Sequence, residues 1–255
     1  MRFTKLRQLA VRFSAPARLL GGWVFISVFS GCAGTPSTTI STDASRVFNP
    51  SLRVAIDIDD SPRPASEPQS GKAFEIEAGR AKGGGYQTLA TGQAPVIINN
   101  TTFSGPQQLR NDFDFSYAKV SFRWRKFFGE RQRAGIELAG GLGYAALGLT
   151  VSSPAQRDSG RFGNMGAQGS VGFIWCMRQS TSLHLRLSTF RSPNAMTYQG
   201  VTSADAAELS FEQALGDNLS LRAGYTSLVV DGSTGPGSDF HTTFSGPMVN
   251  LGLNF

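Results

Sequence analysis

The sequence predicts an all-β protein: an eight-stranded antiparallel up-and-down transmembrane β-barrel preceded by a disordered tether. Three observations support this prediction. From residue 72 onward, apolar residues occupy every second position in segments of about ten residues, which is the strand period. There are eight such segments, and an even number closes an antiparallel sheet with both termini on one side. The connections alternate between short and long, as they do in transmembrane barrels.

The charge of the chain is concentrated at its N-terminus. The 255 residues include 24 Lys and Arg against 18 Asp and Glu, a net charge of +6. Residues 1–31 hold five basic residues and no acidic one, which leaves 19 basic against 18 acidic residues in the remainder. We therefore expect no nucleic-acid partner and no cofactor. Uninterrupted apolar stretches of about 18 residues are absent, which excludes a bundle of transmembrane helices.

Residues 1–31 have the pattern of a secretory signal peptide, with a basic start and a short apolar run. The run leads into Phe29-Ser30-Gly31-Cys32, which resembles the lipobox of bacterial lipoproteins and implies that Cys32 is lipidated. Ordinary cleavage after Ala33 is the alternative. By the same resemblance, Ala33 in place of Asp favours sorting to the outer membrane. A lipidated Cys32 leaves Cys176 without a partner, so we expect no disulfide.

Residues 32–71 have the composition of a flexible tether, because Pro, Ser and Thr are concentrated near both of its ends. Between those ends, Leu52, Val54 and Ile56 alternate with other residues, enough for one short strand. The predicted domains are thus a signal peptide (1–31), a lipidated tether (32–71) and a barrel (72–255).

The eight alternating segments are 73–82, 113–126, 134–150, 163–177, 181–190, 204–214, 218–230 and 243–255. Tight turns follow the second, fourth and sixth of them. The other connections are longer and rich in Gly, Ser, Thr and Asn. We expect the long connections, chiefly 83–112, to lie outside the cell and both termini to lie in the periplasm.

Each segment has one apolar face and one face that carries charges. Charges facing hydrocarbon would cost about 2–4 kcal/mol each near the bilayer midplane, so the charged faces are expected to point inward. Eight strands leave room only for side chains, and no open pore is expected. Within the network we expect His184 to pair with Glu208. The predicted lumen charge network is Glu75, Glu77, Lys119, Arg123, Glu137, His184, Arg186, Glu208, Glu212 and Arg222.

The end of the chain resembles known barrels. Val249, Leu251, Leu253 and Phe255 alternate and finish on Phe, which resembles the C-terminal assembly signal of bacterial outer-membrane barrels. Residues 215–225 are similar to the last periplasmic turn and seventh strand of the small barrels typified by outer-membrane protein A. The resemblance covers residues 72–255. It implies an outer-membrane location, with outer-membrane lipids and the barrel-assembly machinery as partners.

Three functions are consistent with these features. The first, which we favour, is a structural or surface-interaction role without enzymatic activity, through a ligand that the sequence does not name. The second is a lipid-modifying enzyme of the acyltransferase or deacylase type, with His241 close to Asp239, Ser238 and Ser245. The third is a soluble periplasmic lipoprotein with a lipocalin-like barrel, whose apolar faces would point inward. No metal site is expected, because the two His residues lie far apart in the sequence.

Overall fold

The computed structural model describes residues 38–58, 70–129, 131–193, 199–235 and 237–255. Over these residues the fold is all-β, as predicted. A helix long and apolar enough to cross a membrane is not found among them. The predicted signal peptide and Cys32 lie outside the described residues.

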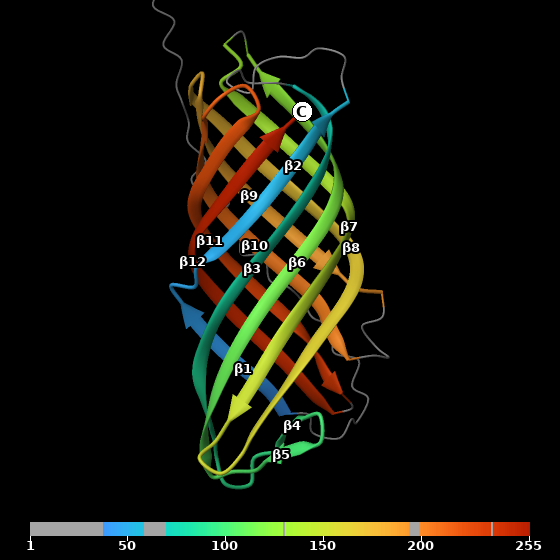
Figure 1. Ribbon diagram of the computed structural model, residues 1–255, viewed down its shortest axis with the longest axis vertical. Helices are drawn as coiled ribbons and strands as arrows, with labels where there is room; N and C mark the ends of the chain where they lie inside the picture. The colour runs from blue at the N-terminus through green and yellow to red at the C-terminus, as the bar shows by residue number, and fades with distance from the viewer. Residues whose placement is uncertain (1–37, 59–69, 130, 194–198, 236) are drawn as a thin grey trace, which may run out of the picture. The chain divides into compact units, whose positions relative to one another are not determined.

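The strands form a barrel and a small hairpin (Figure 1). Ten of them make one sheet in the order β1-β12-β11-β10-β9-β8-β7-β6-β3-β2, and β12 also pairs with β2, which closes the sheet. The eight predicted segments match β3 and β6 to β12. In chain order the strands are β1 (Thr38–Ser45), β2 (Asn49–Asp57), β3 (Gly71–Leu89), β4 (Val96–Ile98), β5 (Thr101–Phe103), β6 (Gln107–Phe128), β7 (Ala134–Ser152), β8 (Arg157–Arg178), β9 (Thr181–Arg191), β10 (Gly200–Ala214), β11 (Leu219–Gly235) and β12 (Ser238–Asn254).

The predicted strand number of eight is wrong, because the N-terminal residues add to the barrel. β1 and β2 follow one another along β12 and pair with it in parallel. Together they fill a ninth position, between β12 and β3. Neighbours around the rest of the barrel are antiparallel. An odd number of positions then requires one parallel pair, and this pair closes the barrel.

The segment predicted as a flexible tether, 32–71, therefore contributes two strands to the barrel wall. Its alternation is the same as in the other strands, with Arg53 buried inside and apolar neighbours exposed outside. Thr38 pairs with Ser238 at the start of β12, whereas Asn254 lies at the other end of that strand. The first described residue and the C-terminal strand end thus lie at opposite ends of the barrel. The prediction that both termini lie in the periplasm stays a prediction, because residues 1–37 lie outside the described part of the chain.

The connections define two different ends of the barrel. The predicted short connections β6–β7, β8–β9 and β10–β11 lie at one end of the barrel, which we call the turn end; residues 179–180 and 215–218 form the last two. At the opposite end, which we call the loop end, β7–β8 and β11–β12 are joined by 153–156 and 236–237 only. Long loops were predicted at these two places. They are absent because the residues expected in them continue the strands.

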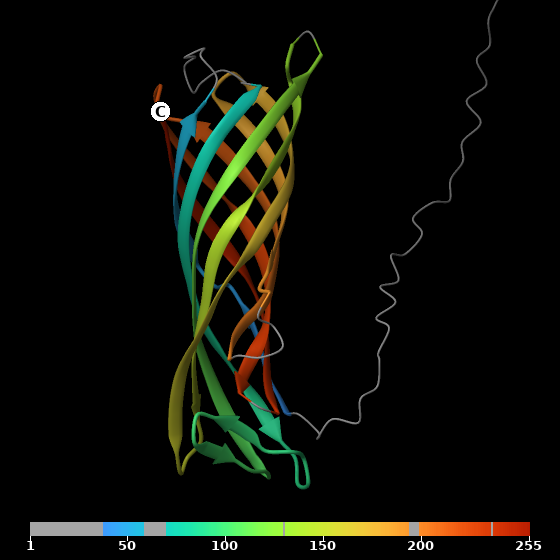
Figure 2. The ribbon, with the colours of Figure 1, turned by 90° about the vertical axis from the view of Figure 1, so that its right-hand side faces the viewer.

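The longest predicted loop, 83–112, is mostly strand, since β3 and β6 take up both of its ends. The β4–β5 hairpin lies in the remaining connection, at the loop end (Figures 1 and 2). The hydroxyls of Thr234 and Ser238 each donate to the Ile97 carbonyl at 3.0 Å. The hairpin therefore covers this end of the barrel. Its fully buried side chains are Val96, Ile98 and Phe103.

One interruption of the backbone ladder in the wall lies between β3 and β1. β3 pairs with β2 only in its turn-end half, and no ladder joins its loop-end half to β1 among the described residues. Gln87 of β3 spans this gap. Its amide donates to the Thr39 carbonyl at 3.0 Å and accepts from the Ser41 backbone N–H at 3.3 Å. Asn111 donates to the same Gln87 oxygen at 3.1 Å. A side-chain amide here takes the place of the backbone ladder.

We expect Gln87→Leu, which keeps the size but removes these hydrogen bonds, to loosen β1. A single net hydrogen bond is worth about 1 kcal/mol, so amide exchange at Ser41 is expected to accelerate roughly two- to tenfold. Hydrogen exchange followed by NMR measures this rate. Gln213→Leu at the turn end is the matched control and leaves Ser41 unchanged. Equal exchange at Ser41 in both variants would show that Gln87 does not hold the strand.

Candidate functional site

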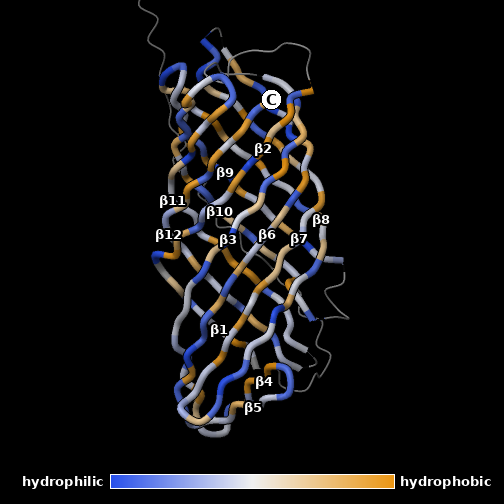
Figure 3. Tube along the Cα trace, in the orientation of Figure 1, coloured by the Kyte–Doolittle hydropathy of each residue, from blue (hydrophilic) through white to orange (hydrophobic). Residues whose placement is uncertain are grey.

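All ten residues of the predicted lumen charge network point into the barrel, in its turn-end half. The side chains alternate along each strand between interior and exterior, and hydropathy alternates with them (Figure 3). Seven of the ten are buried and the other three are partly exposed. The buried seven are Glu75, Glu77, Arg123, Glu137, His184, Arg186 and Arg222, and the partly exposed three are Lys119, Glu208 and Glu212.

Arg186 of β9 lies among three carboxylates. Its guanidinium nitrogens are 2.5 Å from Glu137 Oε1, 3.5 Å from Glu77 Oε2 and 3.9 Å from Glu75 Oε1. Gly172 of β8 lies between Glu137 and Arg186 in the sheet and has no side chain to separate them. One cation thus joins two sides of the barrel through its interior.

A second cluster surrounds Glu212 of β10. Its carboxylate is 2.7 Å from Arg222 Nη2 and 3.1 Å from His184 Nε2. The predicted pairing of His184 with Glu208 is wrong, because the strand register places His184 opposite Ser210. Glu208 instead lies opposite Arg186 in the register and 3.5 Å from Arg222 Nη1.

The sequence analysis left two interior cations out of the network. Arg53 of β2 is only 1% exposed, donates to Glu212 Oε1 at 2.8 Å and lies 4.0 Å from Glu75. Arg125 of β6 is 2.5 Å from Glu137 Oε2. Both follow the same alternation as the predicted residues. Arg53 was missed because its segment was assigned to the tether.

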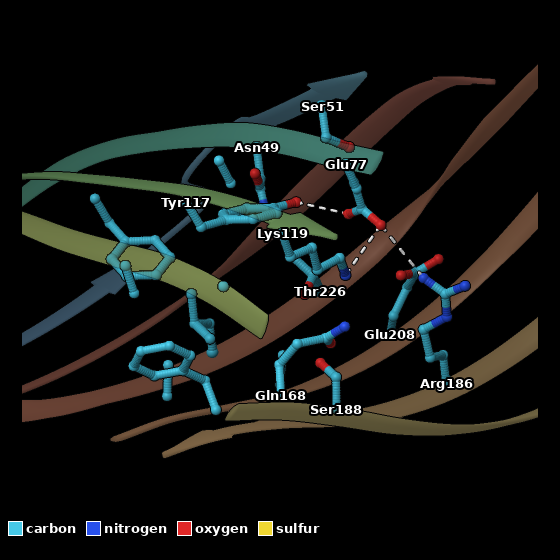
Figure 4. A pocket seen from close by; sticks show the side chains of 18 of the residues that line it. Asn49, Ser51, Glu77, Tyr117, Lys119, Gln168, Arg186, Ser188, Glu208 and Thr226 are labelled. Carbon is cyan, nitrogen blue, oxygen red and sulfur yellow. Dashed lines mark hydrogen bonds and ion pairs between the residues drawn. The ribbon is translucent and has the colours of Figure 1, made fainter. Parts of the chain in front are cut away.

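A cavity of about 110 Å³ lies inside the barrel beside the charge network (Figure 4). On its polar side, Glu77 accepts a hydrogen bond from the Tyr117 hydroxyl at 2.9 Å and lies 3.0 Å from Lys119 Nζ. Its apolar side is formed by Phe115, Phe190, Leu228 and Met248. The cavity therefore lies where the character of the interior changes.

From the cavity to the loop end, the interior is mostly apolar, with a few buried polar side chains such as Thr42, Asn111 and Thr242. The rings of Phe113 and Phe244 stack with centroids 5.1 Å apart, and those of Phe162 and Phe240 are 6.2 Å apart. Aliphatic residues of the neighbouring strands fill the space around them. This half of the barrel has a core like that of a water-soluble protein. Its other members include Ile40, Leu109, Leu147, Leu149, Val151, Val201 and Val230.

Along the same direction, the outer surface of the barrel changes from apolar to polar. On β3, exposed Phe74 and Ile76 in the turn-end half are followed on the same face by exposed Arg80 and Lys82 in the loop-end half. The turn-end half is thus apolar outside and charged inside, and the loop-end half is polar outside and apolar inside. Further exposed apolar side chains include Leu52, Val120, Phe122, Leu138, Leu142, Val171, Phe173, Trp175, Leu185, Leu187, Leu209, Phe211, Tyr225, Leu251 and Phe255.

Ion pairs on the outside of the loop-end half are exposed to solvent. Arg80 Nε donates to Asp114 Oδ1 at 2.6 Å, and this hydrogen bond keeps the pKa of the Asp114 carboxyl below its usual range. Arg191 binds Asp205 through two hydrogen bonds of 2.8 and 2.9 Å. Such exposed pairs contribute about 0–1 kcal/mol, so this surface behaves like that of a soluble protein.

His241 was predicted to lie in a loop, but it lies within β12. Its Nδ1 is 2.6 Å from Asp231 Oδ1, and its Nε2 is 3.4 Å from the Thr243 hydroxyl. Asp239, Ser238 and Ser245 are not its hydrogen-bond partners among the described residues. Ser238 is buried and donates to the Ile97 carbonyl, and Ser245 accepts from the Tyr225 hydroxyl at 3.1 Å.

No family model, no curated protein and no solved structure is similar to this chain at a significant level. The functional argument therefore rests on the geometry of the barrel.

The predicted assembly signal lies along the parallel pairing of β12 with β2, which closes the barrel. Its residues are Val249, Leu251, Leu253 and Phe255, and the Phe255 N–H donates to the Ala55 carbonyl at 2.9 Å. Cys176 is free and buried. Within the described ranges, no group of three His, Cys, Asp or Glu side chains is arranged to hold a metal ion.

Proposed function

We propose that this chain is an integral outer-membrane β-barrel whose turn-end half lies in the bilayer and whose loop-end half projects into water. Its role is structural or surface-interactive, through the projecting half. The observation that supports this is the inversion of polarity, inside against outside, between the two halves of one continuous barrel.

The physical argument is that a side chain matches the medium it faces. Apolar side chains exposed on all sides of the turn-end half are stable only if the surroundings are apolar, since water around them would cost about 25 cal/mol per Å². On β12 the outward apolar stretch runs from Pro247 to Phe255, which agrees with the roughly 9–11 residues that a tilted strand needs to cross a bilayer. Trp175, Tyr225 and Phe255 suit the interfaces, where aromatic residues concentrate.

We further propose that the lumen does not conduct ions. The charge network fills the turn-end half, and the apolar core and the β4–β5 hairpin fill the loop-end half. A soluble lipocalin-like barrel agrees less well with the geometry, because it requires the apolar faces of the eight segments to point inward. In the turn-end half these faces are exposed.

The proposed orientation places the turn end and the C-terminus in the periplasm, and the loop end outside the cell. Thr38, which lies at the loop end, is then outside as well. Outer-membrane lipids and the barrel-assembly machinery are the proposed partners. Lipidation of Cys32 remains part of the proposal and falls in the undescribed N-terminal residues.

Membrane fractionation combined with gel migration tests the proposal. The folded protein is expected in the outer-membrane fraction, and to migrate differently in detergent gels before and after boiling. Cys32→Ala separates anchoring by lipid from anchoring by the barrel, and the barrel is expected to keep this variant in the membrane. Release of Cys32→Ala into the soluble fraction contradicts the proposal.

A second candidate function is acyl transfer or hydrolysis at the membrane surface. It is favoured by the Thr243, His241 and Asp231 side chains, which place a hydroxyl, an imidazole and a carboxylate in sequence on the outer face of the loop-end half. Measurement of phospholipid and lipid A turnover in cells carrying His241→Ala tests it. Unchanged turnover removes this candidate and leaves the structural role.

A further inference from the structure

Three uncharged side chains that line the interior cavity each have a buried polar atom without a hydrogen-bond partner among the described residues. The atoms are Asn49 Oδ1, Asn250 Oδ1 and Gln168 Nε2; of the charged lining residues, Glu77 Oε2 and Arg222 Nε also lack a hydrogen bond. Asn250 is 4% exposed and Asn49 is 9% exposed, so bulk water does not satisfy them. Figure 4 shows Asn49 and Gln168 among the lining side chains. Leaving such atoms unpaired costs about 1–3 kcal/mol each, which indicates that the cavity is occupied in the folded protein.

The charged groups of the lining are already paired with one another. Glu77 is held by Lys119, Tyr117 and Arg186, and Glu208 is 3.5 Å from Arg222. An ion entering the cavity would have to break these pairs. The unpaired atoms of the uncharged side chains are two acceptors and one donor, and a hydroxyl group donates one hydrogen bond, so it can satisfy one of the two Asn oxygens. The polar part of an occupant is therefore an uncharged hydroxyl.

The other side of the cavity is lined by apolar side chains, so it favours an occupant with an apolar part. Phe115, Phe190 and Leu228 line it, together with the small side chains of Ala204 and Ala206. A volume of about 110 Å³ is somewhat below the roughly 150 Å³ of an apolar protein cavity that binds benzene. The apolar part of an occupant is therefore at most about six carbon atoms.

We propose that this cavity is a binding site for a small uncharged alcohol or phenol, with the hydroxyl donating to the side-chain oxygen of Asn49 or Asn250 and the apolar part against Phe115 and Phe190. The site lies between the charge network and the hairpin-covered apolar core.

Phenol and toluene are the probes, added to the folded full-length protein in detergent micelles and followed by NMR. Cross-relaxation from the ring protons to the methyl groups of Leu228, inside the barrel, is expected with phenol. Detergent-bound probe would instead reach Leu185, outside the barrel. Phenol is expected to bind about tenfold more tightly than toluene, which lacks the hydroxyl. This comparison uses the unaltered chain and does not depend on the folding of any variant.

Ala206→Leu fills the cavity and is expected to abolish the Leu228 signal. Ala207→Leu is the matched control, because it makes the same change at the next residue, on the exposed outer face, and retains binding. Equal binding of toluene and phenol overturns the proposal. So does a signal confined to Leu185, or a cavity that shows water alone. These outcomes leave the membrane location untouched, since they are measured on a barrel already folded in detergent.

Discussion

Val171→Arg is expected to destabilise the protein by about 2–4 kcal/mol when it is folded in lipid vesicles. Val171 is 49% exposed and lies near the middle of the outward apolar stretch of β8, between Met165 and Met177. In the proposed orientation the arginine would face hydrocarbon close to the bilayer midplane. Urea unfolding, followed by the fluorescence of the barrel tryptophans, measures the change in the free energy of unfolding.

The control for this substitution lies on the same strand. Ser159 is exposed on β8 in the loop-end half, where water is proposed to surround the barrel. Ser159→Arg is expected to change the free energy of unfolding by no more than about 0.5 kcal/mol. If Val171→Arg is tolerated as well as Ser159→Arg, the outward apolar residues do not face lipid.

The second large effect is expected inside the barrel. Arg186→Ala removes the cation that lies 2.5 Å from Glu137 and within 4 Å of Glu75 and Glu77. Removing one partner of a buried ion pair costs about 3–5 kcal/mol, because the other charge stays buried without compensation. The same unfolding measurement gives this loss. A partial recovery is expected when Glu137→Gln is added, since it removes one of the uncompensated carboxylates.

Arg191→Ala is the matched control for the interior network. Arg191 lies on the same strand as Arg186 and pairs with Asp205, but the two side chains are 56% and 48% exposed. Its loss is expected to cost about 0–1 kcal/mol. A similar cost for both variants would mean that water screens the interior charges. The barrel would then hold an aqueous channel, contrary to the proposed closed lumen.

The sequence was sufficient to predict the strands of the turn-end half. There each strand has apolar side chains on one face and polar or small ones on the other, as in Phe74 and Ile76 against Glu75 and Glu77. This is the strand period in its simplest form, and it also predicts which side chains point inward. Individual ion pairs were less predictable, because they depend on strand register. The register places His184 opposite Ser210 and not opposite Glu208.

The loop-end half was mistaken for loops because the polarity inversion changes which positions are apolar. On β6 the buried Phe113 and Phe115 occupy odd positions, whereas the exposed Val120 and Phe122 occupy even ones. The strand continues, but its apolar positions shift by one. A search for strands that assumes apolar residues on one face only would place the end of the strand at this shift. The same shift is therefore a sequence signal for the polarity inversion between the two halves of the barrel.

The ninth position was missed for a different reason. The alternation around Arg53 was recognised as a short strand, but the surrounding Pro and Ser placed it in a tether. Sequence pattern alone does not say which strand it pairs with. Its partner, β12, lies nearly 200 residues away, as in the hydrogen bond from Asn250 to Ser51. Long-range parallel pairing of this kind leaves no local signal.

The most direct test of the central claim, that only the turn-end half lies in the bilayer, is a spin-label accessibility measurement along the outer face of β7. Labels would be placed by Leu138→Cys, Leu142→Cys and Thr150→Cys in a background without Cys32 and Cys176, with the protein folded in lipid vesicles. Labels at 138 and 142 are predicted to be accessible to oxygen and protected from an aqueous nickel reagent, and the label at 150 to show the reverse. Equal access of the nickel reagent to all three positions would contradict the account.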